Sequence, residues 1–482
     1  MFGTLAPNLL KFFVSIDLRD DCMDSRVDSM NQIERRAMSG LSLVFAFRML
    51  GMFMVLPVLA TYGPELASTS GLPVPLLIGI AIGAYGLTQA LLQIPFGMLS
   101  DRVGRMPVIY AGLLVFALGS GVAAMAESIE MLIAGRIIQG AGAISAAVMA
   151  LLSDLTREQH RTKVMAGIGM SIGLSFVVAM IAGPVITRWV GLSGLFWFTS
   201  LMALFGIFLM AVWVPKPQKQ MRHLDSGINR AALRRVFADS QLLRLDVGIF
   251  VLHALLMASF TVLPLVLVEQ GGLPREEHWW VYVIAMVTGF VAMVPFIIYS
   301  EKQRQLKKVF LGAIALVGLS QLYFWLLGFN LVMLVIGAVL FFAAFNLLEA
   351  TLPSLISKIA PAGAKGTAMG IYSTSQFLGA AVGGFLGGGL YTLGGNGAVF
   401  AGCAALAALW WFFAATMQEP PYVTSTRLTV AGDSSPDEEL LERLRDQPGV
   451  MDALYVAEEA AVYVRFDNKL NEREQLQAML GS

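Results

Sequence analysis

The stretch GMLSDRVGRMPVIY, residues 97–110, places Asp101, Arg102 and Arg105 between two apolar runs. Each run has about 20 residues, the length that crosses a bilayer core of ~30 Å as a helix. We therefore interpret the stretch as a short surface loop between two membrane-spanning helices. Gly104 suits a tight turn and Gly97 a close approach of two helices.

The same alternation continues along the chain. Its 482 residues are 57% hydrophobic and only 14% charged, with a mean hydropathy of +0.70. A soluble protein of this size needs more charge on its surface, and a β-barrel would show alternating strands of about 10 residues. We predict an all-α protein embedded in a lipid bilayer with twelve spans, at 41–61, 75–98, 107–126, 129–152, 163–187, 192–214, 245–268, 279–299, 307–328, 330–355, 366–391 and 396–416.

The spans divide six and six around a long polar stretch. After the last span, the segment order βαββα suggests a small α+β domain of the ferredoxin-like kind. In the linker between the halves, Ala231 to Leu243 has the pattern of a helix that lies on a membrane surface. The predicted parts are an extension without fixed structure (1–38), a first half (39–214), a linker (215–244), a second half (245–417), a short linker (418–426) and the C-terminal domain (427–482).

Loop charge predicts the orientation. The loops 99–106, 153–163, 215–244, 300–308 and 356–365 together hold eighteen Lys and Arg residues, whereas the six loops of the other face hold only Arg188 and Arg275. Positively charged loops stay in the cytoplasm. Both termini and the C-terminal domain are therefore expected in the cytoplasm.

The two halves repeat one another weakly. Residues 100–112, SDRVGRMPVIYAG, match residues 300–312, SEKQRQLKKVFLG, at an offset of 200 residues. Asp101 corresponds to Glu301 and Arg102 to Lys302, but Gly97 and Gly104 have no glycine counterparts. Two parallel six-helix halves predict a substrate site between them, near the middle of the membrane.

The repeat also suggests a role for the opening stretch. It places the end of the second span beside the start of the eleventh, near 366–367. Asp101 would then stabilise a positive helix end by up to ~2 kcal/mol, with Arg102 and Arg105 beside it and Asp154 as a second partner of Arg105. Such a latch would hold the cytoplasmic side shut. The alternative is a turn that only keeps the loop inside.

Three motifs resemble those of the major facilitator superfamily. GMLSDRVGRMP resembles its motif A, and residues 136–154, RIIQGAGAISAAVMALLSD, resemble motif B with Arg136 and Gly140 in place. Residues 167–184, GIGMSIGLSFVVAMIAGP, resemble the glycine-rich motif C of its antiporter branches, with Gly173 inside and Gly183–Pro184 at the end.

The resemblance covers about 40–416, and the C-terminal domain extends it to bacterial members that carry such a domain. It implies a proton-driven transporter of the bacterial inner membrane, with a motif A aspartate that secures the outward-facing state. On this chain that role falls to Asp101, with Arg105 and Asp154 as its relay. The resemblance also implies that Arg136 takes part in proton coupling.

Charged side chains inside a span are costly and usually face a cavity or a partner. Arg48 in the first span is a cavity candidate for anionic or proton-linked cargo; the alternative is an arginine bound to backbone carbonyls. Glu349, near Asn346 in the tenth span, is the best acidic candidate for carrying a proton; the alternative is a structural partner for Arg48 or another polar group. Arg136 has the alternative of bonding carbonyls of the first or second span. His253 can titrate near neutral pH, or serve only as a polar anchor.

Our leading hypothesis is a secondary transporter that exports a small molecule in exchange for protons. Proton-coupled uptake and a membrane sensor that signals through the C-terminal domain are the alternatives. The sequence contains no catalytic triad, nucleotide-binding loop or metal-ligand spacing. We therefore expect no enzymatic activity, cofactor, metal or nucleic-acid partner. The C-terminal domain is expected to contact the cytoplasmic loops or to self-associate.

Overall fold

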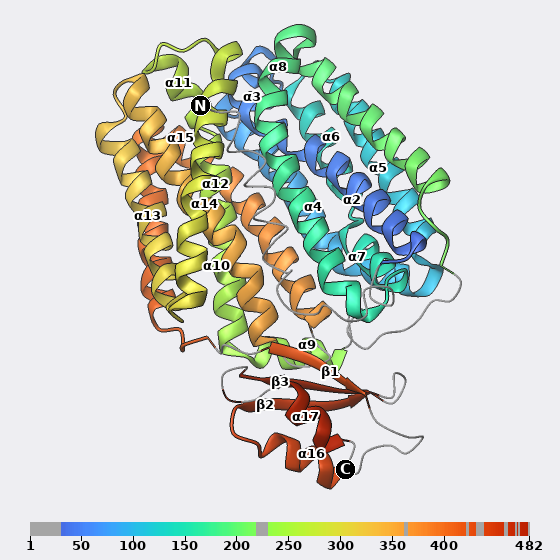
Figure 1. The fold of residues 1–482 in the computed structure, drawn as a ribbon. Helices are drawn as coiled ribbons and strands as arrows, with labels where there is room; N and C mark the ends of the chain where they lie inside the picture. The colour runs from blue at the N-terminus through green and yellow to red at the C-terminus, as the bar shows by residue number, and fades with distance from the viewer. Residues whose placement is uncertain are drawn as a thin grey trace, which may run out of the picture.

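The computed structural model describes residues 30–217, 230–360, 365–420, 424–429, 438–456, 461–467, 470 and 473–480. A long helical unit carries a small domain with three strands at one end (Figure 1). We call this end of the helical unit the proximal end and the opposite end the distal end. The predicted all-α membrane fold with a small α+β domain is confirmed.

Helices of the first half are short where proline or glycine interrupts them. The break between α2 and α3 comes directly before Pro57, which occupies the first turn of α3. The elements of this half are α2 (Gln32–Phe53), α3 (Leu56–Tyr62), η1 (Gly63–Glu65), α4 (Val74–Val103), α5 (Arg105–Ala124), α6 (Ile129–Ala141), α7 (Ser145–Asp154) and α8 (Glu158–Val212).

The second half repeats the pattern. Pro264 in the first turn of α11 interrupts its first span as Pro57 interrupts that of the other half. The elements are α10 (Ser240–Phe260), α11 (Leu263–Glu269), η2 (Arg275–Glu277), α12 (His278–Lys302), α13 (Leu306–Leu327), α14 (Leu331–Ile359) and α15 (Lys365–Ala415).

Ten helical stretches among the described residues are long and apolar enough to span a membrane. Two of them, Gly167–Val212 and Gly366–Ala415, have 46 and 50 residues. At about 1.5 Å per residue each is twice as long as one span requires. A non-helical glycine divides each one, Gly191 with φ +69° and Gly395 with φ +63°. Counting these two as pairs gives the twelve spans predicted.

The first helix begins earlier than predicted. Asn31 caps it: its Oδ1 accepts a hydrogen bond from the Glu34 amide at 2.8 Å, and its own amide donates to Glu34 Oε2 at 2.8 Å. This reciprocal pair satisfies two free amides of the first turn. The expectation of no fixed structure is thus wrong for 32–38, while 1–29 lie outside the described residues.

The amphipathic helix of the linker is shorter than predicted. It forms α9 (Arg230–Ala238), which packs on α10 and α15 near the small domain (Figure 1). It ends there because the Asp239 side chain accepts hydrogen bonds from the amides of Gln241 and Leu242 and so starts α10. The predicted end at Leu243 is therefore wrong.

The small domain has the predicted βαββα order, and its class as ferredoxin-like stays a prediction. Its sheet order is β1-β3-β2, with both pairs antiparallel. Leu428, Leu444, Val464 and Leu476 belong to its own apolar core. Its elements are β1 (Thr424–Thr429), α16 (Glu438–Arg445), β2 (Val450–Val456), β3 (Ala461–Phe466) and α17 (Arg473–Leu480).

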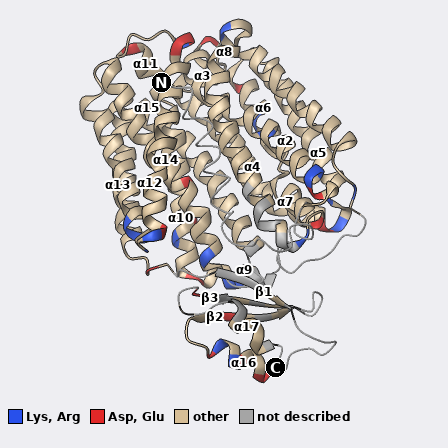
Figure 2. Ribbon diagram, in the orientation of Figure 1, with Lys and Arg blue, Asp and Glu red and all other residues tan. Residues whose placement is uncertain are grey.

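The two halves meet most closely between α4 and α15. A side chain added at Gly79 would come within 2.8 Å of the Gly388 Cα, so only glycine permits this approach. Farther along, the Phe176 ring of α8 lies 5.9 Å from the Phe345 ring of α14. Charged residues gather at the two ends of the helical unit, with few between (Figure 2). The helices therefore present an apolar band with a small number of interior charges.

Candidate functional site

Three polar side chains from three helices of the second half form what we call the carboxyl cluster. Gln376 of α15 has its Nε2 3.2 Å from Glu349 Oε1 of α14 and 2.8 Å from His253 Nε2 of α10. His253 Nε2 lies 4.0 Å from the other oxygen of Glu349. The Gln376 amide thus donates one hydrogen bond to a carboxylate and one to a neutral imidazole.

The cluster is enclosed but reachable. The His253 side chain is buried, and its Nδ1 has no hydrogen-bond partner. The Glu349 side chain is 34% exposed although it lies inside a 29-residue apolar helix. Asn346, one turn away, is buried and its Nδ2 lies beside Gly289 of α12 without a partner.

The suggested pairing of Glu349 with Arg48 is wrong. Arg48 is 1% exposed and donates to Ser145 Oγ at 3.1 Å and to Gln89 Oε1. Gln89 in turn donates to Gln93 Oε1 at 2.8 Å. The carbonyl alternative for Arg48 is also wrong, because its partners are side chains. Among the described residues no carboxylate neutralises it.

Arg136 shows the geometry of the structural alternative. Its Nε donates to the Ala81 carbonyl of α4 at 3.2 Å, and its Nη1 donates to Gln139 Oε1 at 2.6 Å. Gln139 continues to Ser120 Oγ at 2.8 Å. The guanidinium also lies over the Tyr85 ring, 4.8 Å from its centre. Arg136 thus ties α6 to α4 and α5 within the first half.

The opening stretch forms an ion-pair chain at the proximal end. Arg105 binds Asp101 and lies 3.4 Å from Asp154 Oδ2, as predicted for the relay. Arg105 also donates to Ser100 Oγ at 2.9 Å, and that hydroxyl donates to the Gly97 carbonyl at 2.7 Å. Gly97 is buried within α4. The chain links α4, α5 and α7 of one half.

Of two predictions for this turn, the one for Gly104 is confirmed and the one for Arg102 is wrong. Gly104 separates α4 from α5 with φ +112°, a conformation that only glycine adopts cheaply, as predicted. Arg102 is exposed and pairs with no described residue, so its predicted place beside Asp101 is wrong. Adjacent residues on a helix point in different directions. The predicted contact of Asp101 with the start of α15, near 366–367, stays a prediction.

The second-half copy makes a different chain. Glu301 pairs with Lys358 at the end of α14 at 2.6 Å, and Lys302 is exposed. Arg304, which corresponds to Gly104, has φ +50°, the one positive φ of a non-glycine residue in the described chain. Its guanidinium binds both carboxylate oxygens of Asp467 in the small domain, at 2.8 and 2.6 Å.

The glycines of motifs B and C divide into packed and open positions. A side chain at Gly140 would clash with the Tyr85 carbonyl, and one at Gly183 with the Met54 carbonyl. Pro184 follows inside α8. A side chain at Gly173 would meet nothing within 4 Å.

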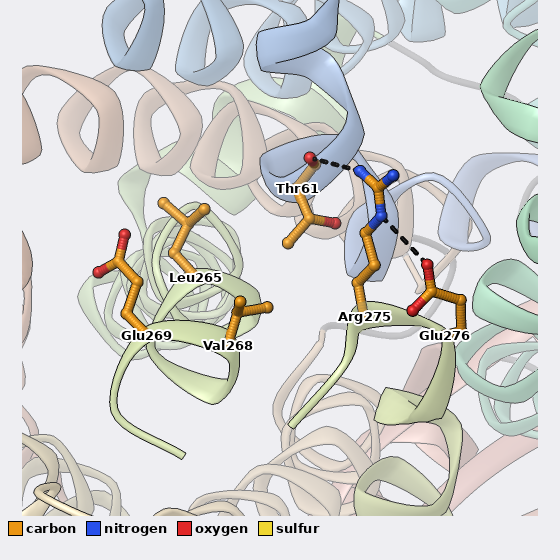
Figure 3. A pocket seen from close by; sticks show the side chains of 6 residues that line it. All are labelled: Thr61, Leu265, Val268, Glu269, Arg275 and Glu276. Carbon is orange, nitrogen blue, oxygen red and sulfur yellow. Dashed lines mark hydrogen bonds and ion pairs between the residues drawn. The ribbon is translucent and has the colours of Figure 1, made fainter. Parts of the chain in front are cut away.

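Sequence reasoning missed a contact between the halves at the distal end, which we call the distal clasp. Arg275 of η2 donates to Glu65 Oε1 at 2.5 Å and to the Thr61 carbonyl at 3.3 Å, and lies over the Tyr62 ring, 3.8 Å from its centre. Arg275 and Thr61 line a cavity of about 360 Å³ there (Figure 3). The one sequence signal for Arg275 was that it is one of only two basic residues in the six loops of this face.

A second omission is Asp246 of α10. It is 5% exposed, and neither carboxylate oxygen has a hydrogen-bond partner. Its place at the edge of an apolar segment made it resemble a flanking surface charge. Among the described residues, no group of three His, Cys, Asp or Glu side chains is placed to hold a metal ion.

Comparison with known proteins agrees with this architecture. The chain is 50% identical over 444 residues to the Inner membrane transport protein YajR of Escherichia coli, which covers 92% of this chain and 97% of that protein. It is 26% identical over 355 residues to the Multidrug resistance protein MdtH of Proteus mirabilis, covering 72% and 84%.

Solved structures show the same fold. The human organic anion transporter MFSD10 superposes with a TM-score of 0.60 at 20% identity, over 80% of this chain and all of that one. The nucleoside transporter NupG superposes with a TM-score of 0.62 at 14% identity, over 79% and 99%. The profile of the Major Facilitator Superfamily matches residues 41–306 and 245–457. The chain therefore belongs to the major facilitator superfamily and is a membrane transporter.

Proposed function

We propose that this transporter exports a small organic molecule in exchange for protons, and that Glu349 carries the proton. The observation that supports this most directly is the carboxyl cluster. A carboxyl group inside an apolar helix is costly and is kept where it works in a proton or substrate pathway. Glu349 combines a buried oxygen that has no hydrogen-bond partner with a side chain that is partly exposed.

The cluster can also signal its protonation state. The Gln376 amide donates to Glu349 and His253 at once, which suits a carboxylate and a neutral imidazole. A proton on His253 Nε2 would remove that acceptor, so the amide would have to turn or move, whereas a proton on Oε2 of Glu349 leaves Oε1 able to accept. Because the three residues belong to α10, α14 and α15, protonation would change how these helices are held together.

The membrane potential can supply the energy that export requires. One proton that crosses with the membrane potential supplies about 2.3 kcal/mol per ~100 mV. The positively charged loops support an orientation with the proximal end and both termini in the cytoplasm. The relatives named for multidrug resistance and for organic anion transport support a small organic cargo. Uptake with the same machinery remains the runner-up, decided by the direction of accumulation in everted vesicles.

Proton release tests the role of Glu349. A thermal-shift screen of small organic cations and anions on the purified protein supplies a ligand. Its addition to protein in weak buffer is expected to release about one proton per protein, and Glu349→Gln is expected to bind ligand without release. Glu269→Gln, a carboxyl of the same half at the distal cavity, serves as the control. Undiminished release from Glu349→Gln would reject the assignment.

The small domain is proposed to dock on the transporter through Arg304 and Asp467. The bidentate pair joins the turn after α12 to the end of β3. It sits next to Glu301, which is tied to α14 by Lys358. Movement of α14 during transport would therefore be felt at the docking contact. This favours a regulatory domain over a separate sensor output.

A further inference from the structure

The buried carboxyl of Asp246 has no role in the site described above. It lies in the first two turns of α10, and both of its oxygens lack a hydrogen bond. Leaving a buried carboxylate unsatisfied costs several kcal/mol. A structural role would require a partner, and the structure shows none for this residue. Asp246 is therefore better explained by a proton that it binds and releases.

Its position connects it to the carboxyl cluster. Asp246 precedes His253 by seven residues, two helical turns, so both lie on one face of α10. On α15, Tyr372 precedes Gln376 by four residues and lies on the same face. The two helices pack tightly, since a side chain at Gly379 would clash with the Phe250 backbone between Asp246 and His253.

Tyr372 is the natural connection between the two carboxyl groups. Its hydroxyl is buried without a hydrogen-bond partner, and Tyr372 lies one turn from Gln376, the partner of Glu349, on the helix that packs against α10. A phenol hydroxyl both donates and accepts a proton. Asp246, Tyr372 and Glu349 thus come from three helices that pack on one another, with Asp246 nearer the proximal end.

No described basic side chain near Asp246 neutralises its charge. The helices that pack on α10 are α9, α14 and α15, with α3, α4 and α11 toward the distal end. Tyr372 comes from α15 and Glu349 from α14, while Arg234 and Arg235 of α9 are exposed. On α10 itself, Arg244 donates to Thr416 and to the Ser240 carbonyl. None of these basic groups forms an ion pair with Asp246.

We infer that Asp246 is a second proton-binding residue and that Tyr372 relays protons between it and Glu349. The inference rests on the proposed function and deepens it by naming the path from the proximal end. When Glu349 releases its proton, the Tyr372 hydroxyl accepts that proton and donates its own to the Asp246 carboxylate. Tyr372 ends unchanged, Asp246 becomes neutral and Glu349 becomes charged.

Time-resolved infrared spectroscopy tests the relay without a transport substrate. The full-length protein in lipid nanodiscs is subjected to an alkaline pH jump, and the protonated-carboxyl bands are assigned through Asp246→Asn and Glu349→Gln. The Glu349 band is expected to decay about tenfold more slowly, or slower still, in Asp246→Asn and Tyr372→Phe. Ser259→Ala, a buried polar residue of α10 that bonds Gln321 instead, should leave the rate unchanged.

The outcomes separate the relay from the proposed function. An unchanged decay rate in both Asp246→Asn and Tyr372→Phe would overturn the relay, while Glu349 would keep its role. A Glu349 band that never responds to pH would overturn both. Because Tyr372→Phe removes one oxygen atom and keeps the ring, it carries the test if Asp246→Asn does not fold.

Discussion

The interior charges are distributed unequally between the halves. Arg48 and Arg136 are fully buried in the first half, each bound to amide, hydroxyl or carbonyl oxygens and to no carboxylate of the described residues. Glu349 and Asp246 lie in the second half, where neither pairs with a described Lys or Arg residue. An unpaired interior charge persists where function needs it.

Glycine positions within motif C give a prediction at this scale. Gly183→Ala is expected to lower the free energy of unfolding by about 1–3 kcal/mol, since its Cβ would meet the Met54 carbonyl and come within 3.1 Å of Pro57. Gly173→Ala on the same helix has open space and is expected to be neutral or to stabilise by up to ~1 kcal/mol. Unfolding of purified protein in detergent compares the two. Equal losses would contradict the packing argument.

Residue types could be predicted from the sequence more readily than their partners. Arg105 and Asp154 were expected together because motif A and the end of the fourth span share a face of the bundle. The partners of Arg48 and Glu349 could not be foreseen, because side chains on different helices meet through packing that one chain does not encode locally. Asp246 was missed because hydropathy cannot distinguish a buried acid near a helix end from a flanking one.

At the scale of elements, span positions follow from length and hydropathy, but their ends follow from capping. The Asn31 capping box extended α2 toward the N-terminus, and Asp239 ended α9 early. The turn at Arg304 shows the same dependence on context. It keeps the positive φ of its repeat partner Gly104 at a cost of about 1 kcal/mol, and its side chain is held by Asp467.

The docking contact yields a prediction. Arg304→Ala and Asp467→Asn should each raise hydrogen exchange at the amides of 303–306, because a bidentate ion pair contributes about 1–3 kcal/mol. The double variant should exchange no faster than the faster single variant. Arg304→Gly should undock the domain equally while it stabilises the turn relative to Arg304→Ala by up to ~1 kcal/mol. Arg443→Ala, whose ion pair with Glu439 lies within α16, is the control.

For the whole molecule, the distal clasp and the motif A chain lie at opposite ends of the bundle. Arg275 joins the two halves in this structure, so the distal end is held closed. Asp101 is meanwhile bound within its own half by Arg105. If Asp101 contacts the start of α15 when the proximal end closes, the two contacts alternate, and each stabilises one of the two states of the transporter.

This alternation predicts opposite effects of two substitutions. Leu265→Cys, in a background without Cys22 and Cys403, reports distal opening through a membrane-impermeant maleimide, because Leu265 lines the distal cavities. Arg275→Ala should raise the labelling rate about fivefold, the equivalent of about 1 kcal/mol for a partly exposed pair. Asp101→Asn should lower it, and the double variant should return toward the parent rate.

Glu276→Gln breaks only the pair within η2 and should change nothing. The distal clasp contains an ion pair, so high salt should reduce the effect of Arg275→Ala on the labelling rate. Effects of the same sign from Arg275→Ala and Asp101→Asn would rule out alternation.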